Sequence, residues 1–412
     1  MKIKSALIIL ILSSSIFASG GPLYTRYGIG DIILSQSARE FGMAETGIAF
    51  SQPDHLGIIN PASWHSVVLT RFLSGISFRG YDISNNSSSA FYSQTEIAGL
   101  SIAIPISNDY GITFAGGLAP YSNVNYDVLL ESDDDILGGS TSEYTGDGGL
   151  SKAYFGISYK LPFDLAVGAT FDYYNGKRDY SSKITFSEFT DVENTEYQTV
   201  LKSHGLGYSF GLISPDIAKL ISSTRITNLR LGLTYNAVAS FEVDSVSAYR
   251  NSKGYNEFQN KNYDSEIPAR LGLGLSMTWD ENYTLLFDFV NQNFSQYTVN
   301  NIKSTYLRDL RRYSLGFEYR HNSGRFGSTW EQMIWRAGLS YEETQYKING
   351  KDIDELAVYA GFSFPMGIDN SLDFGFKYGM RGTTDNNLVK ENIFSAVITI
   401  NFGDLWFIRP ER

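Results

Sequence analysis

The sequence lacks cysteine entirely and has only four histidines among its 412 residues. Without cysteine the chain has no disulfides, no thiolate nucleophile and no cysteine-ligated metal. The formal net charge is −11 and lysine and arginine form no cluster, so the concentrated basic face that binds nucleic acid is missing. The histidines match no Ser or Asp pattern of nucleophilic catalysis; they are His55, His65, His204 and His321. We therefore expect no enzyme activity, no cofactor and no nucleic-acid partner.

Long apolar runs are also scarce. The one clear run extends from Ala6 to Leu12, follows two lysines and precedes the small residues at 18–20. This pattern predicts a secretory signal peptide over residues 1–19, because an N-terminal membrane anchor would need about 20 apolar residues. No later segment is apolar enough to cross a bilayer as a helix. The exported chain is therefore either soluble or a membrane β-barrel.

Alternating segments favour the barrel. In residues 267–279 every second residue is apolar, from Ile267 to Trp279, and the residues between them are small or polar. Residues 372–380 repeat the pattern. Such runs last about nine to thirteen residues, whereas strands of globular proteins usually have about five or six. Aromatic residues end several apolar faces, as in the girdles of outer-membrane barrels. We predict an all-β, antiparallel transmembrane barrel in the outer membrane.

Counting the runs gives about fourteen strands within a barrel domain at 66–403, followed by a periplasmic tail at 404–412. Tight connections alternate with the long ones at 128–148, 181–196, 244–263 and 299–308, and long loops face outward in such barrels. The acidic run at 131–135 could bind Ca²⁺, but it lacks the EF-hand spacing and is typical of a solvated loop, so we assign no metal. Connections 214–225 and 322–331 are long for periplasmic turns, and the first could form a short helix. The predicted strands are 67–82, 91–106, 110–127, 150–161, 163–180, 196–213, 226–243, 264–280, 282–298, 309–321, 332–346, 352–365, 370–382 and 391–402.

Residues 20–65 precede the first strand and contain no long alternating run. They include RxxGMA, with Arg39, Gly42 and Met43, and then an Asn-Pro-Ala motif at Asn60, Pro61 and Ala62. The segment and the strand number resemble FadL-type long-chain fatty-acid transporters of the outer membrane. That resemblance implies a plug inside the barrel and hydrophobic substrates. The alternative is a periplasmic linker with a chance turn.

The stretch GGLAPYS interrupts the third predicted strand. Glycine and proline weaken a sheet ladder, and in FadL-type transporters the third strand bends inward and leaves a lateral gap in the wall. We predict such a lateral opening at Gly116, Gly117 and Pro120, facing plug residues near Asn60. The alternative is a plain β-bulge.

The predicted function is passive uptake of hydrophobic, fatty-acid-like compounds with lateral exit at strand three. The alternative is a barrel subunit of a secretion or assembly machine, and the plug argues against an open porin. The expected partners are outer-membrane lipids, a hydrophobic small molecule, the barrel-assembly machinery and, for the alternative, proteins of a secretion complex. Ionisable residues predicted to face the lumen and to pair there are Asp164, Asp172, Arg230, Asp288, Arg312, Glu318, Arg336, Asp373 and Lys377.

Overall fold

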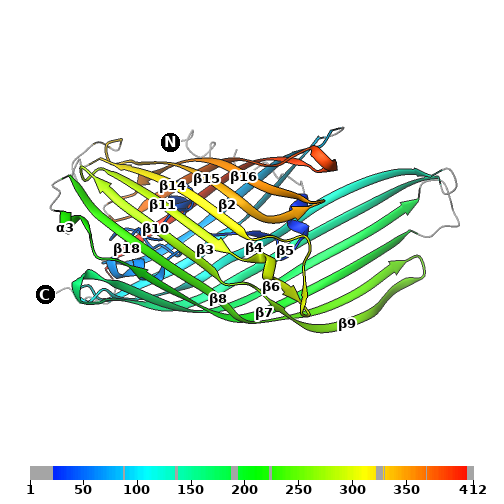
Figure 1. The fold of residues 1–412 in the computed structure, drawn as a ribbon, viewed down its shortest axis with the longest axis horizontal. Coiled ribbons are helices and arrows are strands. Elements are labelled where there is room, and N and C mark those ends of the chain that lie inside the picture. Colours follow the sequence, from blue (N-terminus) through cyan, green and yellow to red (C-terminus); the bar gives the residue numbers. More distant parts are fainter. Residues whose placement is uncertain are drawn as a thin grey trace, which may run out of the picture.

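A computed structural model describes residues 22–86, 89–134, 138–186, 194–221, 225–321, 328, 330–367 and 369–405. The predicted signal peptide and residues 406–412 of the predicted tail lie outside these ranges. Fourteen long antiparallel strands close into one barrel, in which β18 pairs with β2, and the predicted strand number is confirmed (Figure 1). The wall strands are β2 (Thr70–Ser84), β3 (Ser89–Ser107), β4 (Ile112–Asp134), β5 (Gly138–Lys160), β6 (Ala166–Phe186), β7 (Thr195–Ile213), β8 (Ile226–Asn251), β10 (Arg270–Trp279), β11 (Tyr283–Gln292), β14 (Leu310–Arg320), β15 (Ile334–Ile348), β16 (Lys351–Pro365), β17 (Ser371–Gly382) and β18 (Lys390–Asp404).

The strands from β4 to β9 project far beyond the rest of the barrel (Figure 1). Most of the predicted loops 128–148 and 244–263 are therefore strand, and the loop prediction is wrong there: β4 and β5 pair as far as Asp134 and Gly138, and β8 pairs with β9 (Gly254–Glu266). The first half of β8 pairs instead with β10. Apolar alternation ends where a strand leaves the membrane, but the backbone ladder needs no apolar face and continues in water.

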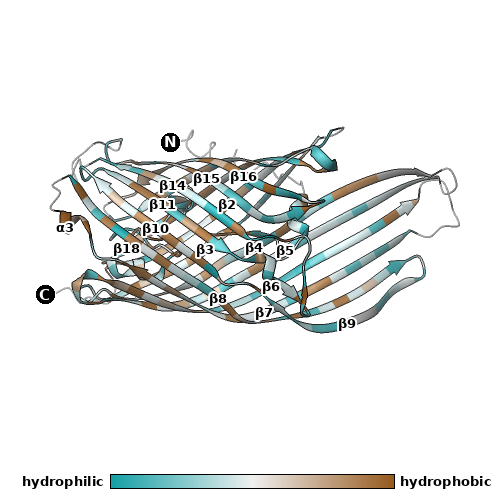
Figure 2. Ribbon diagram, in the orientation of Figure 1, coloured by the Kyte–Doolittle hydropathy of each residue, from teal (hydrophilic) through white to brown (hydrophobic). Residues whose placement is uncertain are grey.

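The outer surface of the wall carries the apolar residues. Leu273, Leu275, Phe376 and Tyr378 are 38–45% exposed, as the predicted facing requires. Figure 2 shows that apolar residues concentrate on the barrel itself, whereas the projecting hairpins are mostly polar. Exposing an apolar surface of this extent to water is unfavourable, whereas such a surface is stable in the hydrocarbon core of a bilayer.

The two ends of the barrel differ. Connections at one end are short, such as 280–282 between β10 and β11, and this end also carries the helix α3 (Ala218–Ile221) and the last strand residues (Figure 1). The short helix predicted in 214–225 is thus present. Because short turns face the periplasm in such barrels, the projecting hairpins lie on the outer side. None of the helices in the described ranges is long and apolar enough to cross a membrane.

Residues 22–66 lie inside the barrel. They form η1 (Leu23–Arg26), the two-residue strand β1 (Asp31–Ile32), α2 (Ala38–Phe41) and η2 (Pro61–Ser66). We call residues 22–66 the plug. Its side chains are mostly buried although the segment has little regular structure, because it packs against the inner wall. At the outer end, Tyr24 and Ile29 of the plug join an apolar cluster that includes Tyr346 and Leu307. The remaining short elements are η3 (Pro162–Asp164), η4 (Phe294–Gln296), β12 (Thr298–Val299), β13 (Ile302–Lys303) and η6 (Asp385–Asn387).

Candidate functional site

Arg39 of the predicted plug motif anchors the plug to the wall through buried ion pairs. Its guanidinium forms two hydrogen bonds with Glu318 of β14, at 2.8 and 2.9 Å, and a third with Asp54 of the plug at 3.1 Å. Arg336 of β15 donates to the same Glu318 carboxylate at 2.8 Å, and Arg320 pairs with Asp54 at 2.8 Å. Burial opposes ionisation of Asp54, but the Arg39 and Arg320 guanidiniums outweigh it and hold the pKa of that carboxyl well below its usual range.

Asn60, Pro61 and Ala62 begin the 3₁₀ helix η2 at the periplasmic end. The Asn60 side chain accepts a hydrogen bond from Ala62 N at 2.9 Å, and Pro61 occupies the first helical turn, where its missing N–H costs nothing. The Asn60 amide also donates to Ile48 O at 2.6 Å and to Leu212 O at 3.3 Å. The motif therefore ties two parts of the plug to strand β7.

Glycines of the wall allow the plug to pack closely against the inner surface of the barrel. A Cβ on Gly211 would lie 1.9 Å from Asn60 Oδ1, and one on Gly274 would lie 2.7 Å from the Ile48 Cβ. Gly42 of the plug meets Gly361 of β16 in the same way, at 3.1 Å. Gly274 faces the lumen, but the plug fills the space in front of it, so a serine there would press on Ile48. The other wall-strand glycines within 3 Å of the plug on this measure are Gly99, Gly168, Gly232, Gly272, Gly316, Gly338, Gly375 and Gly382.

Strands β3 and β4 separate halfway along the wall. Their ladder runs from the pair Ser107 and Ile112 to the pair Leu100 and Leu118 and ends there, whereas β3 continues to pair with β2 as far as Ser89. Gly116 and Gly117 form the rungs just before this end, and Pro120 lies just beyond it, next to a register shift against β5. We call the interval between residues 89–99 of β3 and residues 119–134 of β4 the seam.

Beyond Leu118 the plug takes the place of β3 as the partner of β4. Strand β1 pairs with Ser122 and Asn123, and Ile33 N donates to Tyr121 O at 3.0 Å. The Gln36 amide donates to Leu118 O at 3.2 Å. The predicted neighbour of this region was Asn60, and that detail is wrong: Asn60 lies against β7 near the periplasmic end. The position of a plug residue along the sequence does not indicate which wall strand it contacts.

Side chains bridge the seam where the backbones do not. Asn123 donates to Glu96 at 3.1 Å, and Asn125 donates to Gln94 at 2.9 Å. Arg79 of β2 holds Glu96 in place with a 2.7 Å ion pair. The two amide bridges keep β4 near β3 without forming a ladder.

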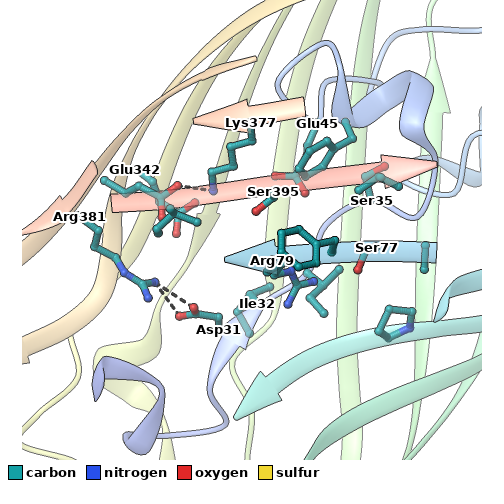
Figure 3. A pocket seen from close by; sticks show the side chains of 18 of the residues that line it. Asp31, Ile32, Ser35, Glu45, Ser77, Arg79, Glu342, Lys377, Arg381 and Ser395 are labelled. Carbon is teal, nitrogen blue, oxygen red and sulfur yellow. Dashed lines mark hydrogen bonds and ion pairs between the residues drawn. The ribbon is translucent and has the colours of Figure 1, made fainter. Parts of the chain in front are cut away.

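A small cavity with many charges lies between the plug and the wall, and it borders the seam at Ala98 and Pro120 (Figure 3). Its volume is about 80 Å³, and acidic and basic side chains line it in equal number. They pair with one another: Arg381 of β17 with Asp31 of the plug at 2.9 Å, and Lys377 with Glu355 at 2.5 Å. Arg312 bridges Glu45 of the plug at 2.7 Å and Glu342 of the wall at 2.9 Å. The pairs of Arg381 and Arg312 join the plug to the wall independently of the Arg39 anchor.

A larger cavity of about 500 Å³ opens at the outer end, between the projecting strands and residues 297–306. Tyr180, Tyr263, Tyr297 and Tyr306 line it together with aliphatic residues, and Arg178 lies in its wall. The Arg178 guanidinium donates to Gly28 O of the plug at 2.9 Å. The sequence pattern did not single out these residues, because they come from separate parts of the chain.

The predicted lumen charges are mostly buried inside and paired. Asp288 accepts from the Gly47 and Ile48 backbone N–H groups at 2.7 and 3.0 Å. Asp164 was misplaced: it lies in the exposed turn before β6 and pairs with Lys219. Arg230 faces the lumen as predicted, opposite Ser276 in the ladder, and donates to Ser214 O near the same end of the barrel. Alternation places a residue on a face but does not give its depth. No cluster of possible metal ligands occurs among the residues that the structure describes.

The histidines take part in local contacts. His55 lies 3.2 Å from Glu40 inside the plug, and His204 lies 3.4 Å from Glu242 on the projecting strands. His65 donates from Nδ1 to Ala62 O at 2.7 Å at the end of the plug. Burial lowers the pKa of His65 to about 4, and the nearby Arg230 and Lys160 act in the same direction.

Solved structures with the same fold include proteins named as transporters and channels. The toluene transporter TodX of P. putida shares 15% identity with a TM-score of 0.61, covering 89% of this chain and 98% of its own. A FadL homologue of Pseudomonas aeruginosa shares 12% with a TM-score of 0.58, covering 90% and 98%. The CymD monoaromatic hydrocarbon channel shares 16% with a TM-score of 0.56, covering 90% and 98%. The FadL-like fold is therefore confirmed.

The sequence comparisons add a family. No curated protein sequence matches the chain. A family model described as BamG, however, matches residues 1–411, and the chain therefore belongs to the BamG family.

Proposed function

We propose that this protein is a membrane-embedded subunit of the outer-membrane barrel-assembly machinery, built on a transporter-like barrel that no longer conducts. The family name associates the chain with barrel assembly. The observation that carries the proposal is the cavity beside the seam, which is small and contains ion pairs among its lining residues. Sites for small ligands usually enclose about 300–1,000 Å³ and are mostly apolar.

The chemistry of this cavity is unfavourable for an apolar cargo. A hydrophobic molecule leaving through the seam would lie against Asp31, Arg381 and their neighbours, and would remove water from charges without replacing their hydrogen bonds. The plug would also have to move, and it is held by the buried pairs of Arg39 and Arg312 with wall and plug carboxylates. Breaking a buried pair on one side costs about 3–5 kcal/mol. A fixed plug suits a structural subunit better than a conduit.

Uptake of hydrophobic compounds is the second candidate, and two observations favour it. The β3–β4 ladder ends at Leu118, and the outer cavity of about 500 Å³ is lined mainly by tyrosine and aliphatic residues. In this case a compound would bind at the outer cavity and leave through the seam. The related solved structures are named as channels or transporters of toluene and monoaromatic hydrocarbons.

Two measurements separate the candidates. The tagged full-length chain is purified from outer membranes in mild detergent and examined for the core barrel-assembly subunit, and the abundance of other barrels is followed after depletion of the chain. A subunit role requires both co-purification and loss of other barrels. If either is absent, the proposal fails.

Uptake is tested with Gly116→Val, Gly117→Thr and Pro120→Thr together, which favour a regular ladder, because β-branched residues fit a pleated surface. Transport of a labelled hydrocarbon should fall only if the second candidate is correct. Heat-modifiable gel mobility of the same variant is the folding control. Unchanged growth and barrel assembly alongside lost uptake would favour the second candidate over the first.

A further inference from the structure

The edge of β3 at the seam has no strand partner. Residues 89–99 pair with β2 on one side, and the ladder to β4 stops before them on the other. No backbone hydrogen bond to a plug residue is present along this edge in the described part of the chain, in contrast with β4, whose edge is paired with β1 and Thr25. The seam therefore has one occupied edge and one open edge.

The outer face of the strand with this edge is apolar. Phe91 and Ile97 point outward from it and are 54% and 70% exposed, among the apolar residues of the outer wall. Acyl chains cannot accept or donate hydrogen bonds, so unpaired N–H and C=O groups at this depth are costly. Barrels normally remove such edges by closing, and an edge left open is a template for a further strand.

Resting on the proposed function, we propose that residues 89–99 of β3 are a docking edge for a β-strand of another outer-membrane barrel protein, added by strand pairing. Gln94 and Glu96 present polar groups on the inner side of this edge, and Phe91 and Ile97 present apolar ones on the outer side. A matching strand must be polar on one face and apolar on the other. That alternation is the pattern of a membrane-barrel strand.

The plug offers a precedent for the same chemistry. Asp31 and Ile32 already add to β4 in antiparallel pairing, outside the sequential order of the wall. The bridges from Asn123 and Asn125 cross the seam through side chains and leave the backbone groups of β3 free of them. An added strand would break these two side-chain bridges but no backbone hydrogen bond.

The test uses a photoreactive benzoylphenylalanine at Phe91, in the full-length protein in its native membrane. The matched control is Phe394 of β18, which is 46% exposed and paired on both sides, with Tyr378 and Gly80. Both replacements substitute one aromatic residue by another on the lipid face. Ile97 supplies a second position if the Phe91 variant does not fold, judged by heat-modifiable mobility.

We expect protein adducts from Phe91 at least about tenfold above those from Phe394, mapped by mass spectrometry to one strand of an outer-membrane barrel. The probe at Ile97 should shift the adduct by about six residues along the same strand, because paired strands advance together. Adducts with lipid alone, or protein adducts that do not follow this register, would overturn the inference. If the chain still co-purifies with the assembly subunit in that case, the docking edge is wrong and the subunit role stands; if co-purification is also absent, the proposed function fails as well.

Discussion

Glu318 is the residue whose change should loosen the plug most. Its side chain is 1% exposed and accepts from Arg39 at 2.8 and 2.9 Å and from Arg336 at 2.8 Å. Glu318→Gln keeps the size of the side chain but removes its charge, so Arg39 keeps only Asp54 at 3.1 Å as an ion-pair partner and Arg336 keeps only Asp373 at 3.9 Å. Removing one partner of a buried ion pair costs about 3–5 kcal/mol. Each 1.4 kcal/mol is about a tenfold change in an equilibrium constant, so opening of the plug should increase by about 10² to 10³.

The absence of cysteine makes the measurement direct. Ser63→Cys places one thiol in the plug at a site that is 2% exposed, and its labelling by a maleimide in membranes reports opening of the plug. In this background Glu318→Gln should label about 10²- to 10³-fold faster. The matched control is Asp179→Asn, which breaks the solvent-exposed pair with Lys177 and should cost about 0–1 kcal/mol. Equal labelling rates of the two variants would refute the idea that the Arg39–Glu318 pair holds the plug.

Leu273→Arg should destabilise the barrel by about 2–4 kcal/mol, because it places a charge on the lipid-facing surface. Gly274→Ser should cost about 1–3 kcal/mol through overpacking against the plug. Both are measured by urea unfolding in vesicles, and full tolerance of the serine would contradict the close contact with Ile48. Gly211→Ala should disrupt the Asn60 cap and raise protease cleavage of the plug, with Gly379→Ala as control, because a Cβ there would lie at least 3.2 Å from any neighbouring atom. Neutral His65 is favoured by the fold, so stability from this group is complete above about pH 6.5 and is lost as the pH falls toward 4; His65→Gln should flatten the unfolding profile in that window, and an unchanged profile would exclude the effect.

The sequence by itself determined the barrel, because period-two alternation places every second side chain on one face whatever the neighbours are. Leu273 and Phe376 face outward as predicted, the strand number is right, and the segment with Arg39 and Asn60 stands apart from the wall by its lack of alternation alone. These are properties of local pattern, which a single strand carries on its own.

Tertiary structure alone decided how the plug meets the wall. Asp31 of the plug, not Asn60, pairs with β4, the third predicted strand. Gly274 contacts the plug instead of facing a free lumen, and Asp164 lies in an exposed turn. These outcomes depend on contacts between residues far apart in the chain, and alternation has no information on depth or partner. The open edge of β3 could not be predicted from the sequence either. The hydrogen bonds missing there are made by the backbone, which every residue shares, so the sequence of a strand looks the same whether or not a neighbouring strand pairs with it.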